Sequence, residues 1–189
     1  MLAKLPNYLT LLRIALIPVF VAFFFVDGLW GRVGAAIVFA IAAITDWLDG
    51  YLARRYNTVS PLGTFLDPVA DKLMVATALV LLTGADRAPG LLTVVIIGRE
   101  IAVSALREWM AEVGQRAKVA VSGMGKLKAT LQMLAIVFLL YDLPVFGLPV
   151  HTIGLVLLLL AAVLTIWSML LYLRAAWPNF DLAPPRGKL

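Results

Sequence analysis

Residues 33–55 read VGAAIVFAIAAITDWLDGYLARR, and this stretch decides the fold. An uninterrupted apolar run, Val33–Ile44, is followed by two aspartates, Asp46 and Asp49, and then by two arginines. Such a run can enter a bilayer as a helix, because a membrane helix needs about 20 residues that are mostly apolar. The stretch therefore predicts a membrane helix that carries carboxylates near one end.

The rest of the chain has the same apolar character. Of its 189 residues, 62% are hydrophobic and 14% are charged, which is too little charge for a soluble domain of this length. The net charge of +5 does not indicate binding to nucleic acid, because the basic residues lie between apolar runs. Cysteine is absent, which excludes disulfides and thiolate chemistry. The predicted surroundings are a lipid bilayer.

Six segments are apolar and long enough to be membrane helices. They run approximately over Leu9–Val26, Val33–Arg55, Leu62–Leu82, Leu91–Met110, Leu127–Tyr141 and Thr152–Arg174. We therefore expect an all-α fold, with one six-helix membrane domain over residues 1–177. A short cytoplasmic tail over residues 178–189 is expected to follow it.

The basic residues predict how this bundle is oriented. One set of helix ends carries Lys4, Arg13, Arg54, Arg55, Arg107, Arg116, Lys118, Lys126, Lys128, Arg174, Arg186 and Lys188. The opposite loops carry only Arg32 and Arg87. Lysine and arginine gather on the cytoplasmic side, so both termini are predicted to be cytoplasmic. His151, the single histidine, falls on the outer side and is predicted to be an ordinary loop residue.

Two pairs of aspartates are predicted to meet in the cytoplasmic half of the membrane. Asp46 and Asp49 are spaced i,i+3, and Asp67 and Asp71 are spaced i,i+4, so each pair projects from one helix face. Burial of each charge costs about 2.5–3.5 kcal/mol on the insertion scale, and the four charges repel one another. A divalent cation removes both penalties, and oxygen ligands suit Mg²⁺, Mn²⁺ or Ca²⁺. The alternative is that these aspartates cap helices or pair with basic neighbours.

Small residues lie on the same faces as the aspartates. Gly50 and Ala53 share the face of the first pair, and Gly63 precedes the second pair by one turn. They leave space for a bulky ligand, and Arg54 at the mouth of the site could bind a phosphate. Near the start of the chain, Asn7 and Thr10 could hydrogen-bond the same ligand, although Thr10 could equally cap a helix.

Read in full, residues 46–71 have the pattern D-x2-D-G-x2-A-R-x8-G-x3-D-x3-D. This pattern resembles the complete motif of the CDP-alcohol phosphatidyltransferase family, and the six-helix layout agrees with that family. The resemblance implies a CDP-linked donor and two divalent ions, Mg²⁺ or Mn²⁺. It also implies that Asp71 is a metal ligand or the general base that activates the acceptor hydroxyl.

The resemblance also carries the remaining donor-site roles. It implies that Asp46, Asp49 and Asp67 are metal ligands and that Asp71 can assist them. It also implies that Gly50, Ala53 and Gly63 make room for the cytidine. Arg54 is implied to contact a phosphate of the donor. We predict that Asn7 and Thr10 contact the cytidine or a phosphate of this donor.

Three further stretches suggest the acceptor. Residues 5–13, 98–101 and 125–132 resemble bacterial phosphatidylglycerophosphate synthases, a branch of that family. Ala129 stands where that branch has threonine, so Thr130 is given no role. The resemblance implies CDP-diacylglycerol as donor and sn-glycerol 3-phosphate as acceptor.

A dianionic acceptor needs cations beside the metal site. Arg99, Arg107, Lys126 and Lys128 are predicted to bind its phosphate, since all four fall at or near the cytoplasmic ends of the fourth and fifth helices. The alternative for Arg107 and the two lysines is the general excess of basic residues inside the cell. Arg99 lies within an apolar helix, where the alternative is a structural pair with a carboxylate.

These inferences predict a multi-pass enzyme of the inner (cytoplasmic) membrane of a bacterium, with its active site facing the cytoplasm. The resemblance implies a homodimer. Within the family, the alternatives are cardiolipin, phosphatidylserine or phosphatidylinositol-phosphate synthases. Outside it, the alternatives are an ion-conducting membrane protein and an inactive scaffold. The apolar outer halves of the helices argue against ion conduction, and the complete set of aspartates argues against an inactive scaffold.

Overall fold

The computed structural model describes residues 5–56, 61–113 and 123–177. Its helices are α1 (Leu5–Phe24), α2 (Gly28–Tyr56), α3 (Pro61–Gly84), α4 (Gly90–Glu112), α5 (Gly123–Tyr141) and α6 (Val150–Ala176). Within them, side chains are described except at residues 5–8, 47, 49–56, 61–65, 67–68, 123–126 and 175. The predicted all-α class and helix number are confirmed for this part of the chain.

The helix boundaries differ most at the start of α2, which begins at Gly28 rather than Val33. Residues 28–32 read GLWGR, and helical hydrogen bonding includes them although the glycines and the arginine interrupt the apolar run. At Gly28 the backbone has a positive φ of 81°, which glycine adopts without strain and which lets the chain turn sharply out of α1.

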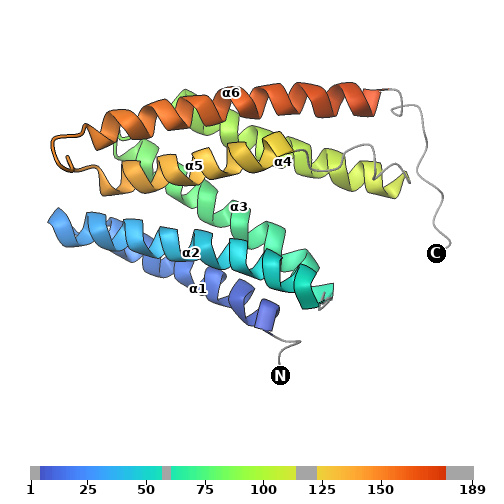
Figure 1. The fold of residues 1–189 in the computed structure, drawn as a ribbon, viewed down its shortest axis with the longest axis horizontal. Helices are drawn as coiled ribbons and strands as arrows, with labels where there is room; N and C mark the ends of the chain where they lie inside the picture. Colours follow the sequence, from blue (N-terminus) through green and yellow to red (C-terminus); the bar gives the residue numbers. More distant parts are fainter. Residues whose placement is uncertain (1–4, 57–60, 114–122, 178–189) are drawn as a thin grey trace.

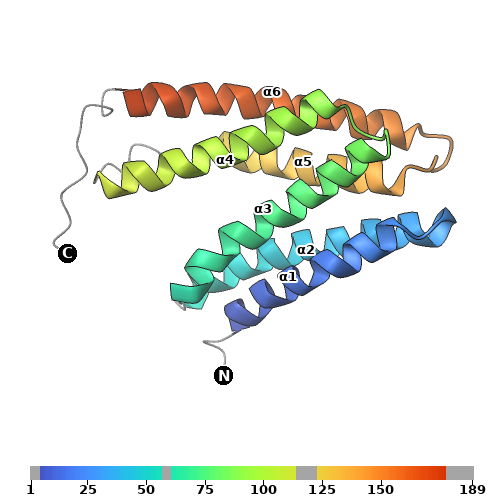
Figure 2. The same ribbon diagram turned by 180° about the vertical axis from the view of Figure 1, so that it is seen from behind.

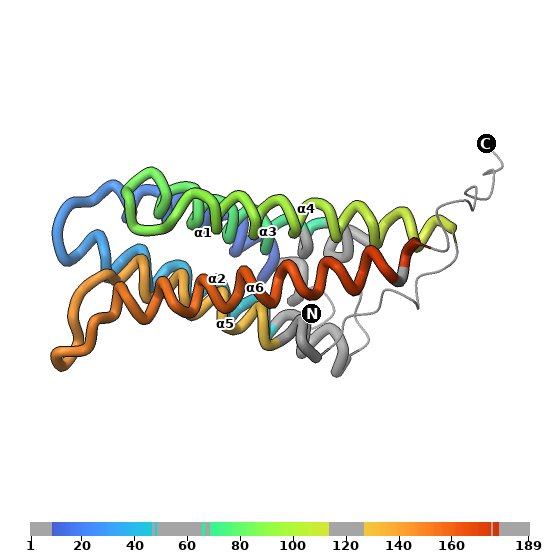
Figure 3. The backbone as a smooth tube through the Cα atoms, turned by 90° about the horizontal axis from the view of Figure 1, so that it is seen from above, coloured from blue at the N-terminus to red at the C-terminus, as the bar shows by residue number. Residues whose placement is uncertain are grey.

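The helices run along the long axis of the molecule (Figures 1 and 3). α1 packs against α2, α5 packs against both α2 and α6, and α4 packs against α6. α3 crosses obliquely from the pair formed by α1 and α2 toward α4 (Figure 2). The three short turns lie at one end of the bundle, and the start of α1 and the end of α6 lie at the other (Figure 1).

The main apolar core joins the helices. Fully buried side chains come from each helix: Phe20, Phe39, Leu79, Ile96, Leu139 and Leu158. The rings of Phe20 and Phe39 lie 6.1 Å apart across the interface between α1 and α2. Gly34 allows this close approach, since a Cβ atom there would lie 2.3 Å from the ring of Phe23.

The outer surface is also apolar. Ile37, Ile41 and Ile44 form an exposed stripe on α2, and Val163 and Trp167 are exposed on α6. Soluble monomers rarely expose apolar patches of this extent, whereas a bilayer solvates them. The surface therefore favours a membrane protein.

Two helical segments, Gly28–Asp46 and Val150–Arg174, are long and apolar enough to cross a membrane. Shorter apolar segments occur at Leu9–Phe24 and Leu127–Tyr141. Among the described residues, α3 and α4 contribute no such segment, and charged residues such as Lys72, Arg99 and Glu100 lie within them. The prediction of six spans is thus supported by length and hydropathy for two helices.

The turn end of the bundle is held together by Asp142. Nη1 of Arg32 donates hydrogen bonds to the main-chain oxygen of Asp142 at 2.7 Å and to Oδ2 of Asp142 at 3.2 Å. Nε of Arg87 lies 3.5 Å from the same Oδ2. Nδ1 of His151 lies 2.7 Å from Oδ1. The prediction that His151 is an ordinary loop residue is wrong, because α6 begins at Val150 and the histidine joins this cluster.

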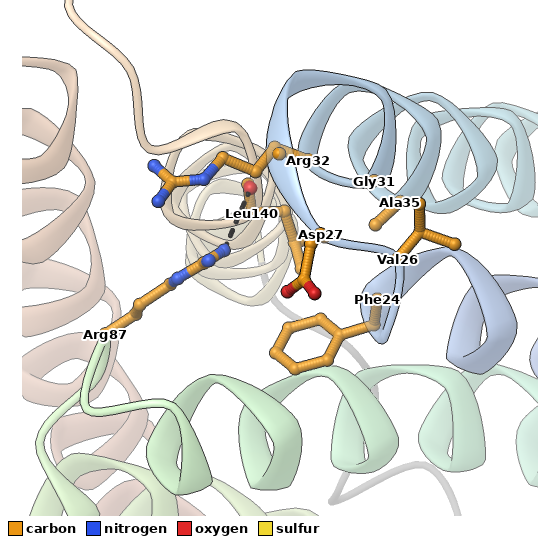
Figure 4. Close-up of a pocket in the computed structure, with 9 residues that line it drawn as sticks. Phe24, Val26, Asp27, Gly31, Arg32, Ala35, Arg87 and Leu140 are labelled. Carbon is orange, nitrogen blue, oxygen red and sulfur yellow. Dashed lines mark hydrogen bonds between the residues drawn. The ribbon is translucent and has the colours of Figure 1, made fainter.

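A pocket of about 120 Å³ opens beside this cluster. Nη1 of Arg87 reaches across it toward the main-chain oxygen of Leu140, 3.4 Å away (Figure 4). The guanidinium of Arg87 also lies 5.7 Å from the ring centroid of Phe24. Burial, and then the positive charge of Arg32, lower the pKa of Arg87, whereas Asp142 acts in the opposite direction. Packing and ion pairing therefore stabilise this end of the bundle.

Candidate active site

Asp46 on α2 forms an ion pair with Arg13 on α1. Its Oδ1 lies 2.9 Å from Nη1 of Arg13, and the side chain of Arg13 is 1% exposed whereas that of Asp46 is 41% exposed. An arginine inside an apolar helix needs a carboxylate beside it, because an unpaired buried charge is costly. Asp46 neutralises Arg13 while part of its own carboxyl group stays accessible.

Asp71 on α3 connects this ion pair to a second group of charges. It interacts electrostatically with both members of the pair and lines a small cavity of about 10 Å³ together with Arg13. It also lines a larger cavity of about 190 Å³, which is bordered by Arg99, Arg107 and Lys128. We call this larger space the cation pocket. Asp71 is therefore shared by the two parts of the predicted site.

The cation pocket gathers three of the four basic residues predicted to bind the acceptor phosphate. Arg99 and Arg107 lie about two turns apart on α4, and Lys128 comes from α5. Arg99 is 6% exposed and Lys128 is 4% exposed. The positive-inside bias concerns basic groups in loops and at helix ends, so the burial of Lys128 favours a role in the pocket over that alternative. Several convergent cations suit an anion with several oxygen atoms.

Glu100 and Ser168 orient these basic groups. Lys128 donates a hydrogen bond to Oε1 of Glu100, and Nη1 of Arg99 lies 3.2 Å from the same oxygen. Nη2 of Arg99 donates a hydrogen bond to Oγ of Ser168 on α6 at 2.7 Å. The alternative pairing of Arg99 with a carboxylate is thus present, but one carboxylate serves two cations. The four basic side chains that line the pocket outnumber its two acidic ones, which leaves it positive.

Lys72 shows how α3 and α4 are joined at this pocket. It donates a hydrogen bond to Oγ of Ser104, which in turn donates to the main-chain oxygen of Glu100 at 2.7 Å. The lysine is therefore directed toward α4. Lys72, which follows Asp71 in the sequence, thus contacts a hydroxyl group.

Several predicted site residues have side chains outside the described set. These are Asn7, Asp49, Gly50, Ala53, Arg54, Gly63, Asp67 and Lys126. Thr10 is described and is 1% exposed. Because α1 begins at Leu5, Thr10 lies in the second turn of the helix and is not its cap.

The described carboxylates fit a hard divalent cation. Asp46 and Asp71 offer only oxygen atoms, the ligands that Mg²⁺ and Mn²⁺ prefer. Among the side chains that the structure describes, no three acidic or histidine groups are close enough to hold an ion. Asp49 and Asp67, one turn from these carboxylates on α2 and α3, lie outside that set. The metal ligation implied by the motif stays a prediction.

Some residues of the site were missing from the prediction of function, among them Arg13, Glu100, Ser168 and Tyr172. For Arg13 a signal exists, since it interrupts the apolar stretch LTLLRIAL and an intramembrane arginine is a functional candidate. Ser168 and Tyr172 carry no comparable signal, because hydroxyl and aromatic side chains are common in membrane helices. Only the packing of α6 against α4 brings them to the pocket.

The motif lies on α2 and α3 of an all-helical bundle, and the apolar surface of this bundle favours a membrane-bound enzyme. Residues 3–167 match the CDP-alcohol phosphatidyltransferase family, and the chain belongs to that family. This confirms the predicted resemblance.

The chain is also similar to individual bacterial enzymes. It is 54% identical over 180 residues to the CDP-diacylglycerol–glycerol-3-phosphate 3-phosphatidyltransferase of Pseudomonas fluorescens, with 93% of this chain and 91% of the relative covered. It is 50% identical over 175 residues to the protein of that name from Escherichia coli (strain K12), with 92% and 94% covered. The relative from Shigella flexneri shows the same identity and coverage.

Proposed function

We propose that this protein transfers the phosphatidyl group of CDP-diacylglycerol to sn-glycerol 3-phosphate, giving phosphatidylglycerophosphate and CMP. The observation that carries the proposal is the cation pocket, in which Arg99, Arg107 and Lys128 adjoin Asp71. It offers a dianionic acceptor a binding site beside a carboxylate that can take a proton. The names of the relatives specify the same acceptor, which supports this choice.

The donor is proposed to bind on the side of Asp71 that lies away from the cation pocket. Two divalent ions, Mg²⁺ or Mn²⁺, would neutralise the pyrophosphate and stabilise the leaving CMP when bound. The residues proposed to hold them are Asp46, Asp49, Asp67 and Asp71. The residues proposed to bind the rest of the donor are Asn7, Thr10, Gly50, Ala53, Arg54 and Gly63.

In the proposed reaction, the acceptor hydroxyl oxygen attacks the phosphatidyl phosphorus, and CMP leaves with the electrons of the broken P–O bond. Asp71 accepts the hydroxyl proton. Arg99, Arg107 and Lys128, joined by Lys126, hold the acceptor phosphate and so keep its hydroxyl near Asp71. The cations serve binding and orientation, and the carboxylate serves the chemical step.

The proposed setting is the inner membrane of a bacterium, crossed six times, with the site and both termini on the cytoplasmic side. The positions of the helix ends support this topology, because the start of α1 and the end of α6 lie at the same end of the bundle (Figure 1). Residues 1–177 form the proposed membrane domain and residues 178–189 the proposed tail. The proposal includes a homodimer, as the family resemblance implies.

An acceptor panel tests the proposed function. The purified protein is incubated in lipid–detergent micelles with CDP-diacylglycerol, Mg²⁺ and one acceptor at a time: glycerol 3-phosphate, serine, inositol phosphate or phosphatidylglycerol. We expect CMP release with glycerol 3-phosphate, loss of release when the metal is chelated, and recovery with Mg²⁺ or Mn²⁺.

The panel separates the donor and acceptor parts of the proposal. Release of CMP only with another alcohol would retain the family reaction but contradict the proposed acceptor. No CMP release with any acceptor would contradict the transferase function. Metal-independent release would contradict the proposed role of the aspartates.

A further inference from the structure

The ring of Tyr172 on α6 lies close to both arginines of the cation pocket. Its centroid is 5.8 Å from Cζ of Arg99 and 5.3 Å from Cζ of Arg107. The ring is buried, with 8% of the residue exposed, and it lines the pocket. One aromatic side chain therefore contacts two guanidinium groups that carry the same charge.

The two arginines differ in their other contacts. Arg99 also has Glu100 at 3.2 Å and Ser168 at 2.7 Å. Within the described part of the chain, Arg107 forms no ion pair, and its buried Nε has no hydrogen-bond partner. Within the described residues, the guanidinium of Arg107 is therefore held mainly by the face of the Tyr172 ring. Removal of the ring would leave Arg99 restrained and release Arg107.

We propose that Tyr172 is a positioning residue that holds Arg107, and secondarily Arg99, in the orientation that receives the acceptor phosphate; this inference rests on the function proposed above. The negative face of an aromatic ring attracts a guanidinium without consuming its N–H donors. A carboxylate in the same place would occupy those donors and cancel the charge that the phosphate needs. The ring restrains the arginine and leaves it able to bind an anion.

This role predicts a particular kinetic effect. The acceptor phosphate is remote from the reacting hydroxyl, so the arginines bind it similarly in the ground state and in the transition state. Loss of such uniform binding raises KM and leaves kcat nearly unchanged. We expect Tyr172→Leu to raise KM for glycerol 3-phosphate about three- to thirtyfold, the range of a cation–π contact. KM for CDP-diacylglycerol should not change.

Tyr172→Phe is the matched control. It retains the ring, and within the described part of the chain the Tyr172 hydroxyl forms no hydrogen bond. KM for glycerol 3-phosphate should therefore stay within about twofold of wild type, since the change keeps the ring that contacts the two arginines.

Packing is the competing explanation, because Tyr172 also touches Val103, Met110 and Ala176 in a small apolar cluster. Phenylalanine analogues with increasing ring fluorination, placed at position 172, separate the two explanations. Fluorine weakens the negative face of the ring while its shape stays nearly constant. KM for glycerol 3-phosphate should rise stepwise with fluorination, with unchanged thermal unfolding.

The possible results are distinct. A flat KM across the fluorinated series, or a wild-type KM in Tyr172→Leu, would overturn the positioning role while the transferase activity stands. A parallel loss of thermal stability and kcat in Tyr172→Leu, with no change in KM, would assign the residue to packing and also overturn it. Failure of the wild-type protein to release CMP with glycerol 3-phosphate would instead contradict the proposed function.

Discussion

Nη1 of Arg13 lies 2.9 Å from Oδ1 of Asp46, so α1 supplies a positive charge to the carboxylates of α2 and α3. Arg13 is buried and Asp46 is half-exposed. The pair therefore keeps the Asp46 carboxylate oriented and balances its charge with that of Arg13. The strength of the ion pair between Arg13 and Asp46 should depend on whether a divalent ion is also bound.

Arg13→Gln should lower thermal stability most when metal is chelated. Asp46 would then lose its counter-charge, at a cost of about 1.5–3 kcal/mol for a charge-assisted contact. Excess Mg²⁺ should recover part of the loss, because a bound ion stabilises the folded state by mass action. Thermal unfolding in detergent, with chelator and then with Mg²⁺, measures both effects. Equal unfolding temperatures for mutant and wild type in chelator would argue against this ion pair.

Asp71→Asn should abolish transfer and leave a folded protein. The amide retains the shape of the side chain but cannot accept a proton, and general-base catalysis contributes about 10²–10⁴-fold. CMP release measures the loss, and size-exclusion chromatography checks folding. Asp86→Asn is the control, because Asp86 is exposed in the turn between α3 and α4 at the opposite end of the bundle. Wild-type activity in Asp71→Asn would exclude Asp71 from the mechanism.

Arg107→Gln should raise KM for glycerol 3-phosphate with little change in KM for CDP-diacylglycerol. Loss of one charged hydrogen-bond donor costs about 1.5–3 kcal/mol, or roughly 10- to 150-fold in affinity. Arg174→Gln removes the same charge from the exposed last turn of α6 and serves as the control. If both variants raise KM equally, the effect reflects surface charge, and Arg107 does not bind the acceptor directly.

Gly31→Ala should destabilise the turn from α1 to α2. A Cβ atom at Gly31 would lie 1.8 Å from the main-chain oxygen of Val26, so the backbone must shift, at a cost of about 2 kcal/mol or more. Gly84→Ala is the matched control, since a Cβ atom there meets no atom within 4 Å. Thermal unfolding of the two variants should differ clearly, and similar values would show that the turn relaxes easily.

The sequence by itself determined the helices and the chemistry that they carry. Apolar runs such as Val33–Ile44 define helices because a chain in lipid must satisfy its own backbone hydrogen bonds. The spacing of Asp67 and Asp71 places both on one helix face, and Arg99 stands out within an apolar segment because an intramembrane charge is costly. Such signals are local, so the number of helices and the family motif could be read directly.

Only the tertiary structure decided which helices meet and which side chains become partners. Arg13 and Asp46 lie on different helices, and the contact of Tyr172 with Arg107 joins α6 to α4. His151 likewise joins Asp142 only because α6 begins at Val150. Apolar patterning predicts that a helix face is buried, but it does not predict which neighbouring helix covers that face, since every helix here is apolar. Packing decides the partner, and it makes an ordinary tyrosine part of the cation pocket.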